Sequence, residues 1–122
     1  MSEGSGFDLT DVVEKLKNFR DSRDWRKFHD PKNLAMSIAI EAAELMEIFQ
    51  WVNSNDSLDK AREQEHRVRE EVADILLYLL SLADTLQIDL RNACLEKLDL
   101  NEKRYPVAES YGRALKYTEL KK

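Results

Sequence analysis

Apolar residues recur at helical spacing along most of the chain, beginning close to its N-terminus. The first set lies three or four residues apart and comprises Leu9, Val12, Val13, Leu16 and Phe19. Asp8 precedes this set and can accept hydrogen bonds from the free amides of a first turn, so we expect a helix over about residues 9–23. Asp30-Pro31 is a second start signal, because proline tolerates the first helical position and aspartate caps it. This second helix is predicted to reach about Val52.

A polar, turn-forming stretch over residues 53–57 separates the second helix from a third helical segment. Ser57 is the expected cap of that segment. The segment is highly charged from Asp59 to Glu71 and almost wholly apolar from Val72 to Leu86. The pattern fits either one long helix or two.

The last predicted helix begins after Asp89, which is its expected cap. It should end before Pro106, because proline disfavours helix in the residue that precedes it. Residues 107–122 are expected to form an irregular, mobile tail, which leaves residues 1–106 as a single helical domain. The chain has only three glycines, at positions 4, 6 and 112, so most of it lacks the residue that hairpins usually need. The predicted fold class is therefore all-α.

Composition narrows the possible partners. Apolar residues make up 43% of the chain and charged residues 35%, as in a globular protein. The net charge of -5 argues against nucleic acid or an anionic membrane as a partner, since both require a concentrated basic surface. The single cysteine, Cys94, and an N-terminus without signal-peptide features favour a cytoplasmic protein. No apolar run approaches the length of about 20 residues that spans a bilayer.

Five acidic residues stand out because they interrupt apolar helices. Glu41, Glu44 and Glu47 are the only charged residues between Asn33 and Asn53, and Glu71 and Asp74 repeat the same three-residue spacing on the next apolar stretch. Residues three apart share a helical face, so two facing helices can present these carboxylates to one cavity.

This set of oxygen donors, without histidine or cysteine, favours Mg²⁺ over zinc or iron. An acidic protein that acts on an acidic substrate needs such a bridging cation. The alternative is that the acids form an exposed polar stripe or pair with arginines from elsewhere in the chain.

The chain carries an ordered set of motifs, which are Arg23–His29, Pro31–Leu34, Glu41–Trp51, Glu70–Tyr78, Lys97–Pro106 and Lys116–Leu120. Together they resemble the MazG-like, all-α nucleoside triphosphate pyrophosphohydrolases, and most of all the dCTP pyrophosphatase branch of that family. One departure is Ala43, where relatives often carry glycine before the second glutamate.

The resemblance implies a role for each matching residue. By this resemblance, Mg²⁺ is coordinated by Glu41, Glu44, Glu71 and Asp74. The nucleoside pocket is formed by Trp25, His29, Trp51 and Tyr78, and the phosphates or sugar are contacted by Lys97 and Asn101. Taken alone, Trp51 and Tyr78 also fit packing roles, His29 fits a helix start, and Lys97 fits a solvated surface.

The implied reaction is attack of water at the α-phosphorus of dCTP or a modified dCTP, which gives the monophosphate and pyrophosphate. Glu47 lies one turn beyond Glu44 and is the candidate catalytic base. The apolar helices also present more apolar surface than one small bundle hides, so we expect a four-to-five-helix bundle completed by oligomerisation, with the resemblance favouring a homotetramer built from dimers. A non-catalytic helical assembly or regulatory module, with the acids holding a structural cation or a basic partner, is the alternative from a different class.

Overall fold

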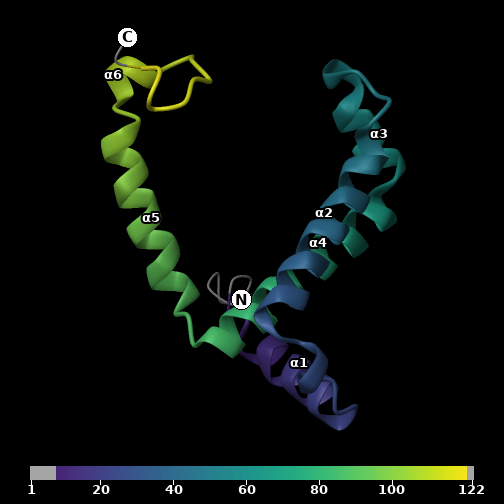
Figure 1. Ribbon diagram of the computed structural model, residues 1–122. Helices are drawn as coiled ribbons and strands as arrows, with labels where there is room; N and C mark the ends of the chain where they lie inside the picture. Colours follow the sequence, from purple (N-terminus) through teal and green to yellow (C-terminus); the bar gives the residue numbers. More distant parts are fainter. Residues whose placement is uncertain (1–7, 121–122) are drawn as a thin grey trace. The chain divides into compact units, whose positions relative to one another are not determined.

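All regular elements in the described part of the chain, residues 8–120 of the computed structural model, are helical (Figure 1). In chain order they are α1 (Thr10–Ser22), η2 (Arg26–Phe28), α2 (Pro31–Phe49), η3 (Ser54–Asp56), α3 (Ser57–Glu63), α4 (Glu65–Leu86), α5 (Leu90–Arg104) and α6 (Val107–Ser110), where η marks a single 3-10 turn. This architecture confirms the predicted all-α fold class.

Aspartates mark the starts of three helices, as the sequence predicts. Asp8 accepts hydrogen bonds from the amide and the hydroxyl of Thr10, at 3.0 and 2.6 Å. Asp30 caps α2 by accepting from the amide of Asn33 at 2.8 Å, and Asp89 caps α5 by accepting from the amide of Asn92 at 3.1 Å. The bonds from the amides of Thr10, Asn33 and Asn92 satisfy donors that have no partner within their own helices.

The chain departs from the expected elements around the polar break and in its last residues. Helix α2 ends at Phe49 instead of about Val52, and Ser57 is the first residue of α3 instead of its cap, because its hydroxyl donates to the carbonyl of Ser54 at 2.8 Å. The third segment is two helices, separated at Gln64, whose φ and ψ of -107° and 30° lie outside the helical range. The expected irregular tail contains α6.

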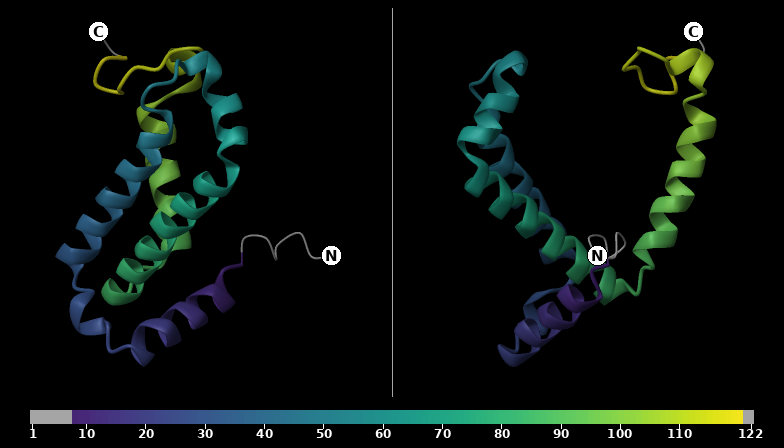
Figure 2. Two further views of the ribbon diagram at one scale, coloured as in Figure 1. Left: turned by 90° about the vertical axis from the view of Figure 1, so that its right-hand side faces the viewer. Right: turned by 180° about the vertical axis from the view of Figure 1, so that it is seen from behind.

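The chain divides into two compact units, Met1–Gln87 and Ile88–Lys122. In the first unit α2 and α4 lie side by side and run in opposite directions, which the views in Figure 2 show as well. Leu34 and Ile48 from α2 and Leu80 and Ala83 from α4 form its buried apolar core. Antiparallel pairing follows from the short connection through η3 and α3.

The second unit contains α5 and α6. Leu120 is buried in it, and the rings of Tyr105 and Tyr117 meet edge to face with their centroids 6.0 Å apart. The guanidinium of Arg104 lies 4.5 Å above the Tyr117 ring. The predicted domain boundary at residue 106 stays a prediction. Among the helices of residues 8–120, none has the length and apolar character to cross a membrane.

Candidate metal centre and its flanking cavities

Three of the predicted acids meet between α2 and α4. One carboxylate oxygen from each of Glu41, Glu44 and Glu71 lies within 4.8 Å of the other two, and all three residues are half-buried. Glu41 and Glu44 share a face of α2 because they are three residues apart, and α4 supplies Glu71 from the opposite side. Two antiparallel helices thus present three carboxylates to one point.

Burial and crowding make the ionised cluster costly without a cation. The pKa of Glu41 is raised from 4.5 to about 7 by burial, by hydrogen bonding of its protonated form to Glu44 and Glu71, and by the negative charges of Glu44 and Asp74. The Oε2 atoms of Glu41 and Glu71 are buried and have no hydrogen-bond partner among residues 8–120. Unpartnered buried carboxylate oxygens are uncommon unless they serve as ligands.

The cluster fits Mg²⁺ in its donor chemistry and in its spacing. All the donors are carboxylate oxygens, and two oxygens bound on opposite sides of one Mg²⁺ at about 2.1 Å lie roughly 4.2 Å apart. Small side-chain movements therefore suffice to bind one ion. Asp74 lies outside the group of three, but its charge acts on Glu41 and its side chain lines the neighbouring cavity. Its role as a fourth ligand stays a prediction.

An apolar cavity of about 290 Å³ adjoins Asp74. Its lining includes Phe19, Arg20, Trp25, His29, Asp74 and Tyr78. The rings of Trp25 and His29 have centroids 6.2 Å apart, and those of His29 and Tyr78 have centroids 6.4 Å apart. The structure therefore brings three of the four residues predicted for the nucleoside pocket into one cavity.

His29 presents an uncharged imidazole to this aromatic cavity. Burial and the positive charge of Arg20 lower the pKa of His29, so the ring is neutral near pH 7. Its Nδ1 atom is buried and lacks a partner among the described residues. A neutral imidazole carries one donor and one acceptor, which suits recognition of a polar ring.

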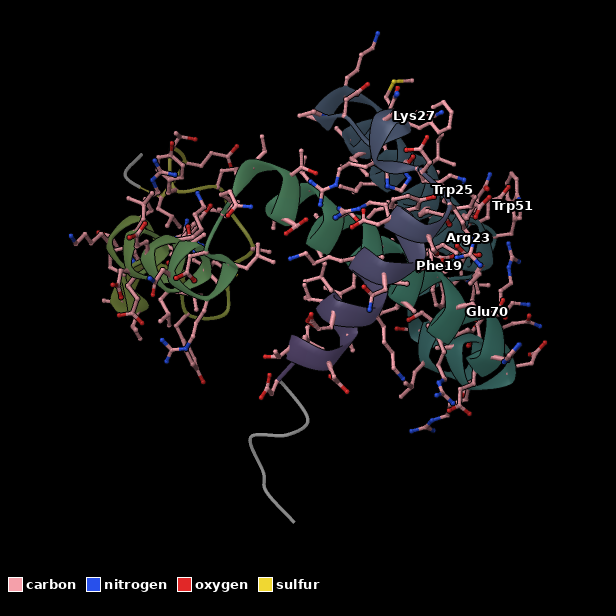
Figure 3. The ribbon with its side chains drawn as sticks, turned by 90° about the horizontal axis from the view of Figure 1, so that it is seen from below. Phe19, Arg23, Trp25, Lys27, Trp51 and Glu70 are labelled. Carbon is pink, nitrogen blue, oxygen red and sulfur yellow. The ribbon has the colours of Figure 1, made fainter. Side chains whose placement is uncertain are left out.

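The sequence between α1 and η2 holds Trp25 at the cavity. Asp24 adopts a left-handed backbone with φ 54°, which aspartate tolerates better than most residues. Trp25 meets Phe19 edge to face with centroids 5.5 Å apart, and the Arg23 guanidinium lies 3.8 Å above the Phe19 ring. Figure 3 shows these three side chains together.

A buried ion pair lies behind the aromatic cavity, and sequence reasoning missed it. Arg20 is only 1% exposed and donates to Asp84 at 3.0 Å, while Lys17 and Arg26 approach the same carboxylate at 3.6 and 3.7 Å. Burial alone would raise the pKa of Asp84, but the hydrogen bond from Arg20 and the three positive charges outweigh it and lower the pKa. One feature of the sequence does indicate that Asp84 has a partner: it is the only charged residue between Asp74 and Asp89.

Trp51 lines a different cavity, of about 230 Å³, together with Glu47, Lys60, Gln64 and Arg67. The structure does not bring Trp51 to the aromatic cavity of Trp25, and its side chain is 88% exposed. One oxygen of Glu47 lies 3.5 Å from the Arg67 guanidinium. Pairing with an arginine from elsewhere in the chain is the alternative that the sequence leaves open for these acids, and Glu47 is paired in this way.

Lys97 and Asn101 belong to α5 in the second unit, one helical turn apart. Lys97 is exposed and Asn101 is half-buried. Their predicted contacts with phosphates or sugar stay predictions.

Comparison with known proteins agrees with the observed helical fold. The model of the MazG-like family matches residues 36–120. The chain is 40% identical to "dCTP pyrophosphatase 1" of Rattus norvegicus and 37% identical to that of Homo sapiens, in each case over 114 residues that make up 92% of this chain and 67% of the relative. A pyrophosphatase from Archaeoglobus fulgidus, known from a crystal structure, is 45% identical, with a TM-score of 0.78 over 80% of this chain and 92% of that one. The chain therefore belongs to the MazG-like family.

Proposed function

We propose that this protein is a Mg²⁺-dependent nucleoside triphosphate pyrophosphohydrolase that converts dCTP or a modified dCTP to the monophosphate and pyrophosphate. Family membership and relatives named dCTP pyrophosphatase 1 support the enzyme class. The observation that carries the metal-dependent chemistry is the cluster of Glu41, Glu44 and Glu71, in which two buried oxygens have no hydrogen-bond partner within residues 8–120. Because such oxygens suit a hard cation, the cluster supports a divalent-metal enzyme over a non-catalytic module.

In the proposed reaction, Glu41, Glu44 and Glu71 would hold the metal, with Asp74 as the fourth ligand. Mg²⁺ bound there would neutralise phosphate charge and lower the pKa of the attacking water. Glu47 accepts the proton of the attacking water, since it lies one turn beyond Glu44 on the same face of α2. The water oxygen bonds to the α-phosphorus, the bond from that phosphorus to the oxygen bridging the β-phosphate breaks, and the monophosphate and pyrophosphate leave.

The aromatic cavity is the proposed site of the base. Trp25 and Tyr78 offer aromatic surface, and aromatic faces stack on nucleobases without requiring a given sequence. The neutral His29 supplies one donor and one acceptor to a polar ring edge. Since Asp74 lines the same cavity, a base bound there lies next to the acids.

A nucleotide panel tests the proposal. We expect pyrophosphate release from dCTP in the presence of Mg²⁺ and none after chelation. Glu41→Gln and Asp74→Asn should each reduce kcat/KM by at least about a hundredfold, the scale on which removing a charge-stabilising group acts. The measurement is pyrophosphate release, with the monophosphate identified by chromatography.

Glu70→Gln is the matched control for these variants, because Glu70 adjoins Glu71 in sequence but pairs with His66 at 3.0 Å. It should keep the wild-type rate. The absence of release from every nucleotide, with Glu41→Gln and Asp74→Asn indistinguishable from wild type in Mg²⁺ binding and stability, would instead favour a regulatory or assembly module.

We also propose a homotetramer, a dimer of dimers, working on the nucleotide pool of the cytoplasm. Large apolar side chains on both central helices are exposed, and they include Met36, Ile40, Val72, Leu76 and Leu79. Exposed apolar side chains that gather on a surface mark an interaction site. The cytoplasmic location is supported by the single cysteine, since small secreted domains commonly depend on disulfides.

A further inference from the structure

The second cavity differs in charge from the aromatic one. Lys60 and Arg67 bring two positive charges to it against one negative charge from Glu47, and Trp51 forms one wall. In the aromatic cavity the lining cation is Arg20, which is buried and already held by Asp84. Within residues 8–120, the cations of the cavity at Trp51, which we call the cationic cavity, make only long contacts with exposed carboxylates: Arg67 with Glu47 at 3.5 Å and Lys60 with Glu63 at 3.8 Å.

The position of the cationic cavity follows from the antiparallel pairing of α2 and α4. Glu41 and Glu44 lie opposite Glu71, and one turn further along α2 the next pair across the helices is Glu47 with Arg67. Asp74, in the opposite direction along α4, lines the aromatic cavity. The acids thus lie between an aromatic cavity at one end and a cationic cavity at the other.

We propose that the cationic cavity binds the β- and γ-phosphates of the triphosphate, and hence the pyrophosphate product, with Arg67 as the main contact. This inference rests on the proposed function, in which the base occupies the aromatic cavity and the α-phosphate lies at the acids. A triphosphate that runs along α2 and α4 from the aromatic cavity past the acids extends its terminal phosphates beyond Glu44, toward Glu47 and Trp51.

Arg67 is available for this contact because its present partner holds it weakly. The pair with Glu47 is long, at 3.5 Å, and both side chains are about half exposed. Exposed pairs of this kind contribute little to stability. The recorded contact with Glu47 joins one nitrogen to one oxygen, whereas a phosphate can accept two parallel charge-assisted hydrogen bonds from the guanidinium, so a phosphate in the cavity competes well with this glutamate.

The exchange of partners has a consequence for Glu47. Once Arg67 turns to a phosphate, the Glu47 carboxylate loses its cation and becomes a free proton acceptor beside the metal site. Arrival of the terminal phosphates therefore releases the base that the proposed reaction needs.

Binding of the two products tests the proposal on the intact chain. Titration calorimetry in Mg²⁺ gives the affinity for inorganic pyrophosphate and, separately, for deoxycytidine monophosphate. Arg67→Ala should weaken pyrophosphate about tenfold or more, the scale of a lost charge-assisted hydrogen bond, and leave the monophosphate within about twofold. Arg69→Ala is the matched control, since Arg69 lines a separate surface hollow with His66 and Glu70. It should change neither affinity.

Three outcomes would overturn the assignment. They are a wild-type protein that does not bind pyrophosphate, equal pyrophosphate affinity in Arg67→Ala and Arg69→Ala, and a loss in Arg67→Ala that falls equally on the monophosphate. The last outcome would indicate that the cationic cavity binds the nucleoside part of the substrate. A wild type that binds pyrophosphate through Arg67 but releases none from any triphosphate keeps the assignment and removes the proposed function.

Discussion

Glu41 shows how a single residue carries the chemistry of the site. Its ionised form is disfavoured by burial and by the neighbouring carboxylates, and one of its oxygens has no partner among the described residues. A divalent cation reverses this preference, because it stabilises the ionised form. The same residue therefore links metal binding, protonation and folding.

In the absence of metal, we expect stability to fall as the pH rises from about 4.5 through about 7. The folded protein binds the Glu41 proton more tightly than the unfolded chain, since the pKa is raised from 4.5 to about 7 on folding. The stabilisation is complete below the unfolded pKa and is lost as the pH passes the folded pKa. Urea denaturation in EDTA across this range measures the effect.

Glu41→Gln is the control for this pH dependence. Glutamine keeps the shape of the protonated acid and does not ionise, so the variant should lose less stability than wild type over the same range. Saturating Mg²⁺ should also reduce the loss in wild type, since it binds the ionised form. A wild type whose stability is flat or rises between pH 4.5 and 7 in EDTA would contradict the expectation.

The residues of the site were predictable to the extent that their sequence surroundings were unusual. Glu41, Glu44 and Glu71 interrupt apolar helices, so the sequence predicts them as a group. Glu47 shares that context but meets an arginine that lies twenty positions further along the chain, as the antiparallel pairing dictates. Arg20 lies among charged neighbours and gives no sign of burial, since that depends on Asp84 in another helix.

At the scale of elements, the Arg20–Asp84 pair fastens α1 to the C-terminal part of α4. Arg20→Ala should destabilise the protein by about 3 kcal/mol, because it leaves a partly buried carboxylate without its main partner. Arg26→Ala is a matched control that removes an exposed arginine from the same carboxylate and should cost less than about 1 kcal/mol. Urea denaturation compares them, and equal losses would show that burial of Arg20 adds nothing.

The helices were predictable where a local signal fixed them. Asp30 and Asp89 marked helix starts because each cap forms within three residues of the chain. The break at Gln64 carried no such signal, since neither glycine nor proline stands there. It depends on how α3 turns back against α2, which is a contact between elements.

At the scale of the whole molecule, the exposed apolar residues of α2 and α4 favour assembly. Val72, Leu76 and Leu79 follow one face of α4 at helical spacing and remain substantially exposed. Leu79→Lys should reduce the assembled mass measured by light scattering, because a charge in an apolar interface loses its solvation. Leu58→Lys, an equally drastic change at an exposed leucine of α3, should leave the mass unchanged.

A wild-type protein that is monomeric at micromolar concentration would contradict the assembly. So would a loss of mass in Leu58→Lys as large as that in Leu79→Lys. The sequence predicted an excess of apolar surface from the composition of its helices, but it did not indicate which faces stay uncovered. That depends on which face α2 and α4 turn to each other, and they bury Leu34, Ile48 and Leu80 in doing so.

Each of the two cavities, on either side of the acidic cluster, contains one tryptophan that can serve as a fluorescent probe. Trp25 and Trp51 are its only tryptophans, one in the aromatic cavity and the other in the cationic cavity. Trp25 packs against Phe19 near Arg23, whereas Trp51 stands in solvent, so their emission spectra should differ. With either one replaced by phenylalanine, the remaining fluorescence reports from a single known place. The order in which the two ends of a ligand arrive and leave then becomes visible in real time without an added label.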